Sequence, residues 1–468
     1  MIGSRASSDV EILVQLRRDG DAPLHHQLEQ QLRDAVRAGR LEPGSVLPST
    51  RAFAADLGLS RGVVIEAYEQ LIAEGYLTSR PGGATWVASA ATPARTQDQR
   101  PAEPVRRIDF RYGRPDVGEF PRQAWLRSLR RALNVAPNES LGYLDGHGAL
   151  ELRESLAAYL NRVRGTAADA GDVVICTGFG QGLSILAHVL RSRGARRVIV
   201  ENPSEDDAQR IIRNAGLELI GIPVDDHGLR VDQLSGVRAD AVLVTPAHQF
   251  PTGGVLPPER RAALVAWAAE HDALIIEDDY DAEYRYDRIP IGAIQGLACD
   301  RTVYAGSASK TLAPGLRLGW MVVPPSLVEG VADAKQLADR GSSILDQLAF
   351  ADFLAAGDFD RHLRRMRPIY RARRDALLDA LERHLPELRP VGASAGLHLL
   401  AWLPAGLGET TVIEAAAERD IGVYGLARYR VEAGRHREGL IFGYAGLTEP
   451  MIDEGVRLLA GAIAETRD

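Results

Sequence analysis

The chain has 468 residues, too many for one ordinary domain, and its 45% hydrophobic and 25% charged residues are typical of a soluble globular protein. No apolar run is long enough to span a bilayer, and residues 1–5 lack the apolar segment of a secretory signal, so we expect no membrane association. Two cysteines exclude a disulfide framework and favour a reduced, cytoplasmic location, and the net charge of −8 means that any DNA binding must rest on a local surface.

Residues 12–88 have the pattern of three helices followed by a hairpin. Apolar residues recur at helical spacing from Leu24 to Val36, which predicts a first helix, and Gly39 is expected to end it. Ser49 and Ser60 can each cap a further helix, and Gly58 separates the two. Two short strands, residues 76–80 and 84–87, follow around a Pro-Gly-Gly turn. The pattern predicts a winged helix-turn-helix DNA-binding domain.

The expected DNA contacts follow from this geometry. The second helix of such a motif presents its N-terminal residues to base edges in the major groove, where Arg61 can contact a guanine in bidentate fashion. Arg51 is placed for the DNA backbone, and Arg80, beside the wing turn, can reach phosphate or the minor groove. The residues predicted to contact DNA are Ser49, Arg51, Ser60, Arg61, Gly62, Val63, Arg80 and Gly82.

The net charge of residues 12–88 argues against DNA binding. Residues 12–88 hold 8 arginines and 9 acidic residues, a net charge of −1 rather than the basic footprint of many DNA-binding domains. A small helical domain that binds protein is the alternative. We favour DNA because the few arginines fall at the expected contact positions.

Residues 89–107 contain three prolines and almost no bulky apolar side chains, so they predict a semi-stiff linker. From residue 108 to 468, short apolar strands alternate with helical stretches. Such alternation indicates a large parallel sheet covered by helices on both faces. From about residue 330 a long helix is expected, followed by a smaller α+β lobe. The expected strands are residues 173–176, 198–200, 241–244, 274–276, 302–305 and 318–323.

Only two lysines, Lys310 and Lys335, occur beside 53 arginines (55 Lys+Arg minus 2). Lysine can lose its proton when buried and form a Schiff base with an aldehyde, whereas arginine cannot. Lys310 follows an apolar strand and precedes Arg317, which suits a pocket for pyridoxal 5'-phosphate (PLP). Lys335 lies in a polar stretch and is expected at the surface.

Other segments support this cofactor. Glycines after residue 176 expose backbone N–H groups at a helix start, where phosphate binds. A carboxylate such as Asp278 can keep a pyridine nitrogen protonated, and Tyr280 can bond the ring oxygen. The alternatives without a cofactor are an ordinary strand-to-helix turn for the glycine segment and a solvated acidic loop for the segment around Asp278. The residues predicted to bind PLP are Gly178, Phe179, Gly180, Gln181, Gln249, Phe250, Asp278, Tyr280, Ser307, Ser309, Lys310 and Arg317.

Motifs in both halves resemble known families. Leu47-Pro48-Ser49-Thr50-Arg51 and Glu74-Gly75-Tyr76-Leu77 are similar to the GntR-type winged helix, although Val64 replaces a frequent threonine that contacts phosphate. The order of phosphate turn, Pro-Thr-Gly, Asp with Tyr, Ser-x-x-Lys and Arg resembles the fold-type I aminotransferases. That resemblance implies Lys310 as the Schiff-base lysine, Asp278 and Tyr280 as ring partners, and Ser307 and Arg317 as phosphate ligands. Phe250 stands where the family has asparagine.

Joined in one chain, the two halves resemble the MocR/GabR-type regulators. That resemblance implies a head-to-tail homodimer that binds double-stranded promoter DNA and senses PLP or a small amine. Arg428 falls near the position where amine-sensing members hold a carboxylate, but Leu440 replaces the carboxylate-binding arginine of aminotransferases, and Glu205 would oppose a carboxylate. These features favour PLP as the signal, as in the PdxR-like branch that controls vitamin B6 synthesis. An active aminotransferase with an accessory DNA-binding domain, and an empty structural scaffold, are the alternatives.

Overall fold

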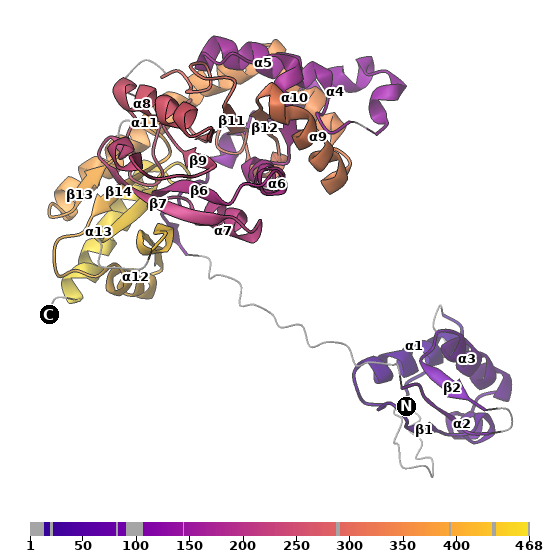
Figure 1. The fold of residues 1–468 in the computed structure, drawn as a ribbon. Helices are drawn as coiled ribbons and strands as arrows, with labels where there is room; N and C mark the ends of the chain where they lie inside the picture. The colour runs from indigo at the N-terminus through magenta and orange to yellow at the C-terminus, as the bar shows by residue number, and fades with distance from the viewer. Residues whose placement is uncertain are drawn as a thin grey trace. The chain divides into compact units, whose positions relative to one another are not determined.

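The computed structural model describes residues 14–18, 22–80, 83–89, 106–143, 145–286, 291–392, 395–432 and 437–466. The chain forms two compact units, residues 1–104 and 105–468, so the division falls inside the predicted linker (Figure 1). Each unit is described by itself below. None of the helices in the described ranges is long and apolar enough to cross a membrane.

The smaller unit is a winged helix. Its helices are α1 (Leu24–Arg37), α2 (Thr50–Leu57) and α3 (Arg61–Ala73), and its strands are β1 (Val46–Leu47), β2 (Leu77–Ser79) and β3 (Thr85–Val87). The strands form an antiparallel sheet in the order β1-β3-β2. Leu28, Leu32, Val64 and Leu71 are each at most 1% exposed, so the helical spacing of apolar residues builds the core that was expected.

The predicted serine cap is present at the start of α2 and absent at the start of α3. Ser49 caps α2, since its side chain accepts a hydrogen bond from the Ala52 N–H, and Gly58 ends that helix in the left-handed conformation. Ser60 occupies the capping position of α3, but its side chain makes no capping hydrogen bond. Val64 is fully buried, so its side chain packs in the core and does not face a phosphate.

The larger unit is built on a sheet in the order β5-β12-β11-β10-β9-β6-β7-β8. β11, β10, β9, β6 and β7 are parallel, as expected. β12 is antiparallel to both neighbours and β8 is antiparallel to β7, so the sheet is mixed, not purely parallel. The chain reaches β12 from β11 through a short connection, which cannot make the long crossover that a parallel neighbour needs. The strands are β5 (Val173–Cys176), β6 (Arg197–Asn202), β7 (Glu218–Asp225), β8 (Gly228–Leu229), β9 (Ala241–Val244), β10 (Leu274–Asp279), β11 (Thr302–Ser307) and β12 (Gly319–Val322).

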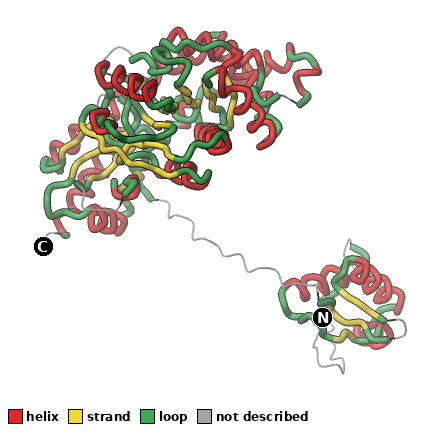
Figure 2. Tube along the Cα trace, in the orientation of Figure 1, coloured by secondary structure: helices red, strands yellow, loops and turns green. Residues whose placement is uncertain are grey.

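Helices cover both faces of this sheet, and Figure 2 shows its strands in yellow among red helices. Alternate strand residues point to opposite faces. Val174 belongs to a hydrophobic core that also holds residues of α6, α7 and α9, whereas Val173 belongs to one that holds residues of α4, α5 and α10. α8 covers the same face as α5 beside Ile199 and Val242. The helices are α4 (Arg122–Val135), α5 (Leu150–Arg164), α6 (Phe179–Ser192), α7 (Asp206–Asn214), α8 (Pro258–Glu270), α9 (Pro325–Asp339) and α10 (Ile344–Ala355).

The region after residue 330 holds more than the single long helix expected. α9 ends at Asp339, α10 follows, and α11 (Asp358–His384) is the long helix. Beyond it lies the predicted smaller lobe, with α12 (Glu409–Glu418), α13 (Glu449–Glu465) and a sheet in the order β13-β14-β17-β16. β4 (Ile108–Asp109) pairs with β15 (Ile421–Gly422), so the start of this unit joins the small lobe. The other strands are β13 (Arg389–Val391), β14 (His398–Trp402), β16 (Tyr424–Gly425) and β17 (Gly439–Gly443).

Candidate cofactor site and DNA-contacting surface

A cavity of about 330 Å³ lies where the parallel strands of the large sheet end. This is the edge where open α/β sheets bind ligands. Nine of the residues predicted to bind a cofactor line it together: Phe179, Gly180, Phe250, Asp278, Tyr280, Ser307, Ser309, Lys310 and Arg317. They come from segments more than a hundred residues apart in sequence, which the sheet brings together.

Lys310 is held in this cavity by one hydrogen bond. Its Nζ donates to the Gly113 carbonyl at 2.7 Å. Burial lowers the pKa of the Lys310 ammonium, although Asp281, Asp278 and Glu205 act in the opposite direction. A lowered pKa increases the fraction of neutral amine, which is the form that attacks a carbonyl carbon.

The two adjacent aspartates of β10 have different surroundings. Asp279 accepts hydrogen bonds from Arg164 Nε at 2.6 Å and from the Tyr304 hydroxyl at 2.7 Å, away from the cavity. The Asp278 carboxylate lines the cavity and has no hydrogen-bond partner among the residues that the structure describes. Burial, together with Asp279 and Glu205, raises the pKa of Asp278 well above its usual value. A cationic ring nitrogen beside it would stabilise the ionised form.

The opposite wall of the cavity is mainly aromatic. The Tyr280 hydroxyl lies 3.0 Å from His248 Nδ1, which in turn lies 3.0 Å from Asp281. Phe250 packs with its ring centroid 5.2 Å from those of Tyr112 and His398. A phenyl ring donates no hydrogen bond to a ring oxygen, whereas Tyr280 and Tyr112 each bring a hydroxyl to this wall. The Tyr112 hydroxyl already accepts a hydrogen bond from the Tyr429 hydroxyl.

The phosphate turn shows why glycine is required there. Gly178 precedes α6 with φ +107°, a conformation that side chains rarely adopt. A Cβ at Gly178 would lie 3.0 Å from Arg317 Nη2, and a Cβ at Gly319 would lie 2.6 Å from the Gly178 Cα. The backbone of the turn and the guanidinium of Arg317 are therefore brought together at one end of the cavity, with Ser307 and Ser309 beside them.

Three residues predicted to bind the cofactor, Gly178, Gln181 and Gln249, do not line the cavity, and Gly178 lies instead beside Arg317. Gln249 is fully buried; its Nε2 donates to the Pro203 carbonyl at 2.9 Å and its Oε1 accepts from the Thr252 hydroxyl at 2.6 Å. Gln181 accepts from the Thr177 N–H and donates to Asp339, both at 2.8 Å. Each amide is fully engaged with protein, so we assign both side chains a structural role.

The structure also places two other basic residues differently from expectation. Arg428 does not line the cavity; its Nη2 lies 2.6 Å from Asp206 Oδ2 in an ion pair. Lys335 is not at the surface: its side chain is 1% exposed and its Nζ lies 2.7 Å from Asp339. The polar stretch around Lys335 is one face of α9, and its lysine points inward.

Sequence reasoning missed several residues that line the cavity. Tyr112 and Gly113 come from the segment after β4, while Leu397 and His398 come from β14 and the residue before it. Burial lowers the pKa of His398 well below its usual value, so this imidazole is neutral in the cavity wall. No motif marks these positions, because the small lobe contributes them only after it packs on the large sheet.

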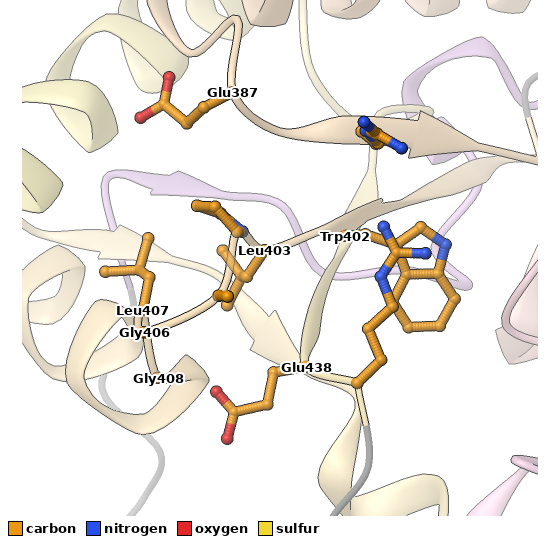
Figure 3. Close-up of a pocket in the computed structure, with 11 residues that line it drawn as sticks. Glu387, Trp402, Leu403, Gly406, Leu407, Gly408 and Glu438 are labelled. Carbon is orange, nitrogen blue, oxygen red and sulfur yellow. The ribbon is translucent and has the colours of Figure 1, made fainter.

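A larger hollow of about 770 Å³ lies on the small lobe and is shown in Figure 3. It is lined by Glu387, Trp402, Leu403 and Glu438, among others, and Arg437 stacks on the Trp402 ring at 4.5 Å. Neither lysine of the chain lines it. It therefore cannot attach an aldehyde cofactor covalently.

On the winged helix, the predicted contact residues are accessible. Arg51, Ser60, Arg61 and Gly62 are exposed, and Val63 is half-buried. Arg61 Nε donates a long hydrogen bond, 3.4 Å, to the Thr50 hydroxyl. The Arg80 guanidinium lies 5.8 Å from the centre of the Trp86 ring. Gly82 lies outside the described residues.

We expect His362→Gln to reduce the loss of stability in acid. His362 Nε2 lies 2.9 Å from the Thr311 carbonyl, and burial lowers its pKa to about 4. The unfolded chain binds this proton near pH 6.5, so the stabilising effect of the neutral ring is complete above that pH and is lost as pH falls toward 4. The full effect is about 3 kcal/mol.

Glutamine keeps an N–H donor for Thr311 but does not titrate. Thermal denaturation of both proteins between pH 7 and pH 4 tests this, and the wild type should lose a few degrees more than the variant. Parallel curves would contradict a buried, neutral His362.

Comparison with known proteins identifies both units. Residues 108–458 match the family "Aminotransferase class I and II", and residues 24–87 match "Bacterial regulatory proteins, gntR family". The probable rhizopine catabolism regulatory protein MocR of Rhizobium meliloti is 35% identical over 470 residues, covering 96% of this chain and 95% of the relative. The pyridoxine biosynthesis transcriptional regulator PdxR of Corynebacterium glutamicum is 34% identical over 432 residues, covering 90% and 92%.

Two solved aminotransferase structures resemble a large part of this chain. Kynurenine aminotransferase of Pyrococcus horikoshii, in complex with PMP, has a TM-score of 0.71 at 27% identity and covers 77% of this chain and 91% of its own. LysN, the α-aminoadipate aminotransferase of Thermus thermophilus, has a TM-score of 0.70 at 27% identity and covers 76% and 92%. With a gntR-type helix-turn-helix before an aminotransferase fold, and relatives that match along nearly the whole chain, the protein belongs to the MocR-type transcriptional regulators.

Proposed function

We propose that this protein is a PLP-dependent transcription regulator, in which the aminotransferase-like unit binds PLP on Lys310 and the winged helix binds promoter DNA. The observation that carries the proposal is Lys310, with its lowered pKa, in one cavity with the unpaired Asp278 carboxylate. A merely structural cavity would not need to keep a half-buried amine close to a carboxylate that has no hydrogen-bond partner among the residues described.

The residues present fit the cofactor. Lys310 would attach the aldehyde, Asp278 would face the pyridine nitrogen and Tyr280 the ring oxygen. Ser307, Ser309, Arg317 and the N–H groups around Gly178 would hold the phosphate. When bound, PLP would supply an electron sink and a carbon that forms reversible bonds to amines.

We propose PLP itself as the signal, with control of vitamin B6 synthesis as the outcome. Glu205 lines the cavity and would repel a carboxylate, and Arg428 is already paired with Asp206. Leu440 is fully buried in β17 and does not line the cavity. Apart from Arg317, no arginine lines the cavity within the described ranges, so an α-amino acid finds no second carboxylate ligand there. The likeness to PdxR supports this direction.

The alternatives are a sensor of small amines and an active aminotransferase. Both would also use Asp278 and Lys310 to bind PLP. Operator binding separates these functions. An operator selected from random duplex DNA is titrated with apo-protein, and PLP, amino acids and γ-aminobutyrate are then added in turn. We expect a change in affinity with PLP and little further change with the amines. A further change with one amine would favour an amine sensor, and sustained amino-group transfer would favour an enzyme.

We also propose that a head-to-tail homodimer binds two half-sites. Exposed apolar side chains on and after α4 support a subunit interface, since Val135 is 81% and Tyr143 is 91% exposed. Half-sites in direct or inverted orientation are both compatible with the linker at residues 89–107. Footprinting at saturation should show two protected half-sites, and protection of one alone would contradict the dimeric arrangement.

A further inference from the structure

The second lysine of the chain is buried beneath the phosphate turn. Lys335 is 1% exposed, and its Nζ donates to Asp339 Oδ1 at 2.7 Å, to Asp339 Oδ2 at 2.8 Å and to the Ser342 hydroxyl at 3.1 Å. All of the donors of the ammonium are thus used inside the protein. A compact ammonium suits this site, whereas a planar guanidinium is larger and needs a fork of acceptors.

From Asp339 the hydrogen bonds continue to the phosphate turn beside the cofactor cavity. Asp339 Oδ2 accepts from Gln181 Nε2 at 2.8 Å, and Gln181 Oε1 accepts from the Thr177 N–H at 2.8 Å. Thr177 is the residue between β5 and Gly178, and Gln181 is in the first turn of α6. The chain of contacts therefore fixes both ends of the turn, in which Phe179 and Gly180 line the cavity and Gly178 lies beside Arg317.

The charges support the same arrangement. Although burial acts to raise it, the pKa of Asp339 is lowered by the hydrogen bonds from Lys335, Gln181 and Gly341, so the carboxylate is ionised. Burial raises the pKa of the Cys176 thiol to about 12, and Lys335 opposes that shift, which places the ammonium near the end of β5. An ionised pair linked to a backbone N–H is stiffer than a solvated turn.

We infer that Lys335 is a positioning residue for the phosphate of the cofactor, acting through Asp339 and Gln181 on the turn at residues 177–180. The inference rests on the proposed binding of PLP, and it concerns the phosphate alone. The ring contacts of Asp278 and Tyr280 lie on other elements and do not depend on this network.

Two ligands, PLP and pyridoxal, distinguish the contacts to the phosphate from the contacts to the ring. The apo form of the full chain is titrated with PLP and with pyridoxal, which lacks the phosphate, and the binding is followed by absorbance. In Lys335→Met we expect the affinity for PLP to fall at least about tenfold, as for the loss of a charge-assisted hydrogen bond. The affinity for pyridoxal should stay within about twofold of the wild type.

Two further variants complete the design. Gln181→Met breaks the link to Thr177 without leaving a buried charge, and it should lower the preference for PLP over pyridoxal in the same way even if Lys335→Met fails to fold. Glu329→Gln changes an exposed residue of α9, 82% exposed at its side chain, and should leave both affinities unchanged.

The outcomes are distinguishable. Equal losses of PLP and pyridoxal affinity in Gln181→Met would overturn the inference, because they would indicate general damage to the cavity. Unchanged affinities in Gln181→Met and Lys335→Met would overturn it as well. Failure of the wild-type chain to bind PLP would instead contradict the proposed function itself.

Discussion

Lys310→Ala is expected to abolish the visible absorption that the purified protein shows with PLP. The Lys310 amine is the group in the cavity that can bond the aldehyde, and burial lowers its pKa so that the neutral form is accessible. Absorbance before and after reduction with borohydride measures the effect. Reduction of the wild type should fix one pyridoxyl group per chain.

Lys335 provides the control for this experiment. It is the other lysine of the chain, and its ammonium is buried in contact with Asp339 and Ser342. Peptide mapping after reduction should therefore find the label on Lys310 and none on Lys335. A label on Lys335, or a visible band that survives in Lys310→Ala, would contradict the assignment.

Arg61→Ala should weaken operator binding by about 1–3 kcal/mol and relax specificity at one base position. Arg61 is exposed at the start of α3 and is restrained by one long hydrogen bond to Thr50. Because that bond is weak, the guanidinium can turn to a guanine edge at little cost. Gel-shift titration against the operator and its single-base variants measures the loss.

Arg51→Ala is the matched variant on the preceding helix. Arg51 is exposed in the first turn of α2, and we expect it to contact phosphate. Its loss should weaken binding to all DNA sequences alike and make binding less dependent on the salt concentration. If neither variant changes binding, α3 is not the recognition helix. If Arg51→Ala alters base preference instead, the two roles are exchanged.

The local sequence determined most of the elements. The spacing of apolar residues placed the three helices and the hairpin of the winged helix, and Ser49 and Gly58 marked the ends of α2 where the structure has them. Short β-branched runs placed the strands, with β5 and β9 at the predicted bounds. These features are readable because periodic burial and capping depend on neighbours within a few residues.

Because lysine is so rare in this chain, the composition drew attention to Lys310, but it did not predict where Lys335 lies or what it does. Lys310 is half-buried and Lys335 is buried, and only the fold places the first in a cavity and the second against Asp339. The bias toward arginine thus drew attention to two lysines, and sequence reasoning predicted a site for Lys310 alone. An i,i+4 pair such as Lys335 and Asp339 is usually solvated on a helix surface, and its burial depends on what packs against α9.

Tertiary structure alone decided which polar groups face the cavity. Asp278 lines the cavity and Asp279 is paired with Arg164, although the two are adjacent in sequence, because side chains of a strand alternate between its faces. Gln181 and Gln249 point away from the cavity, and Arg428 pairs with Asp206. Each of these outcomes depends on a partner tens to hundreds of residues distant, whose position is fixed only when the sheet and the small lobe pack together.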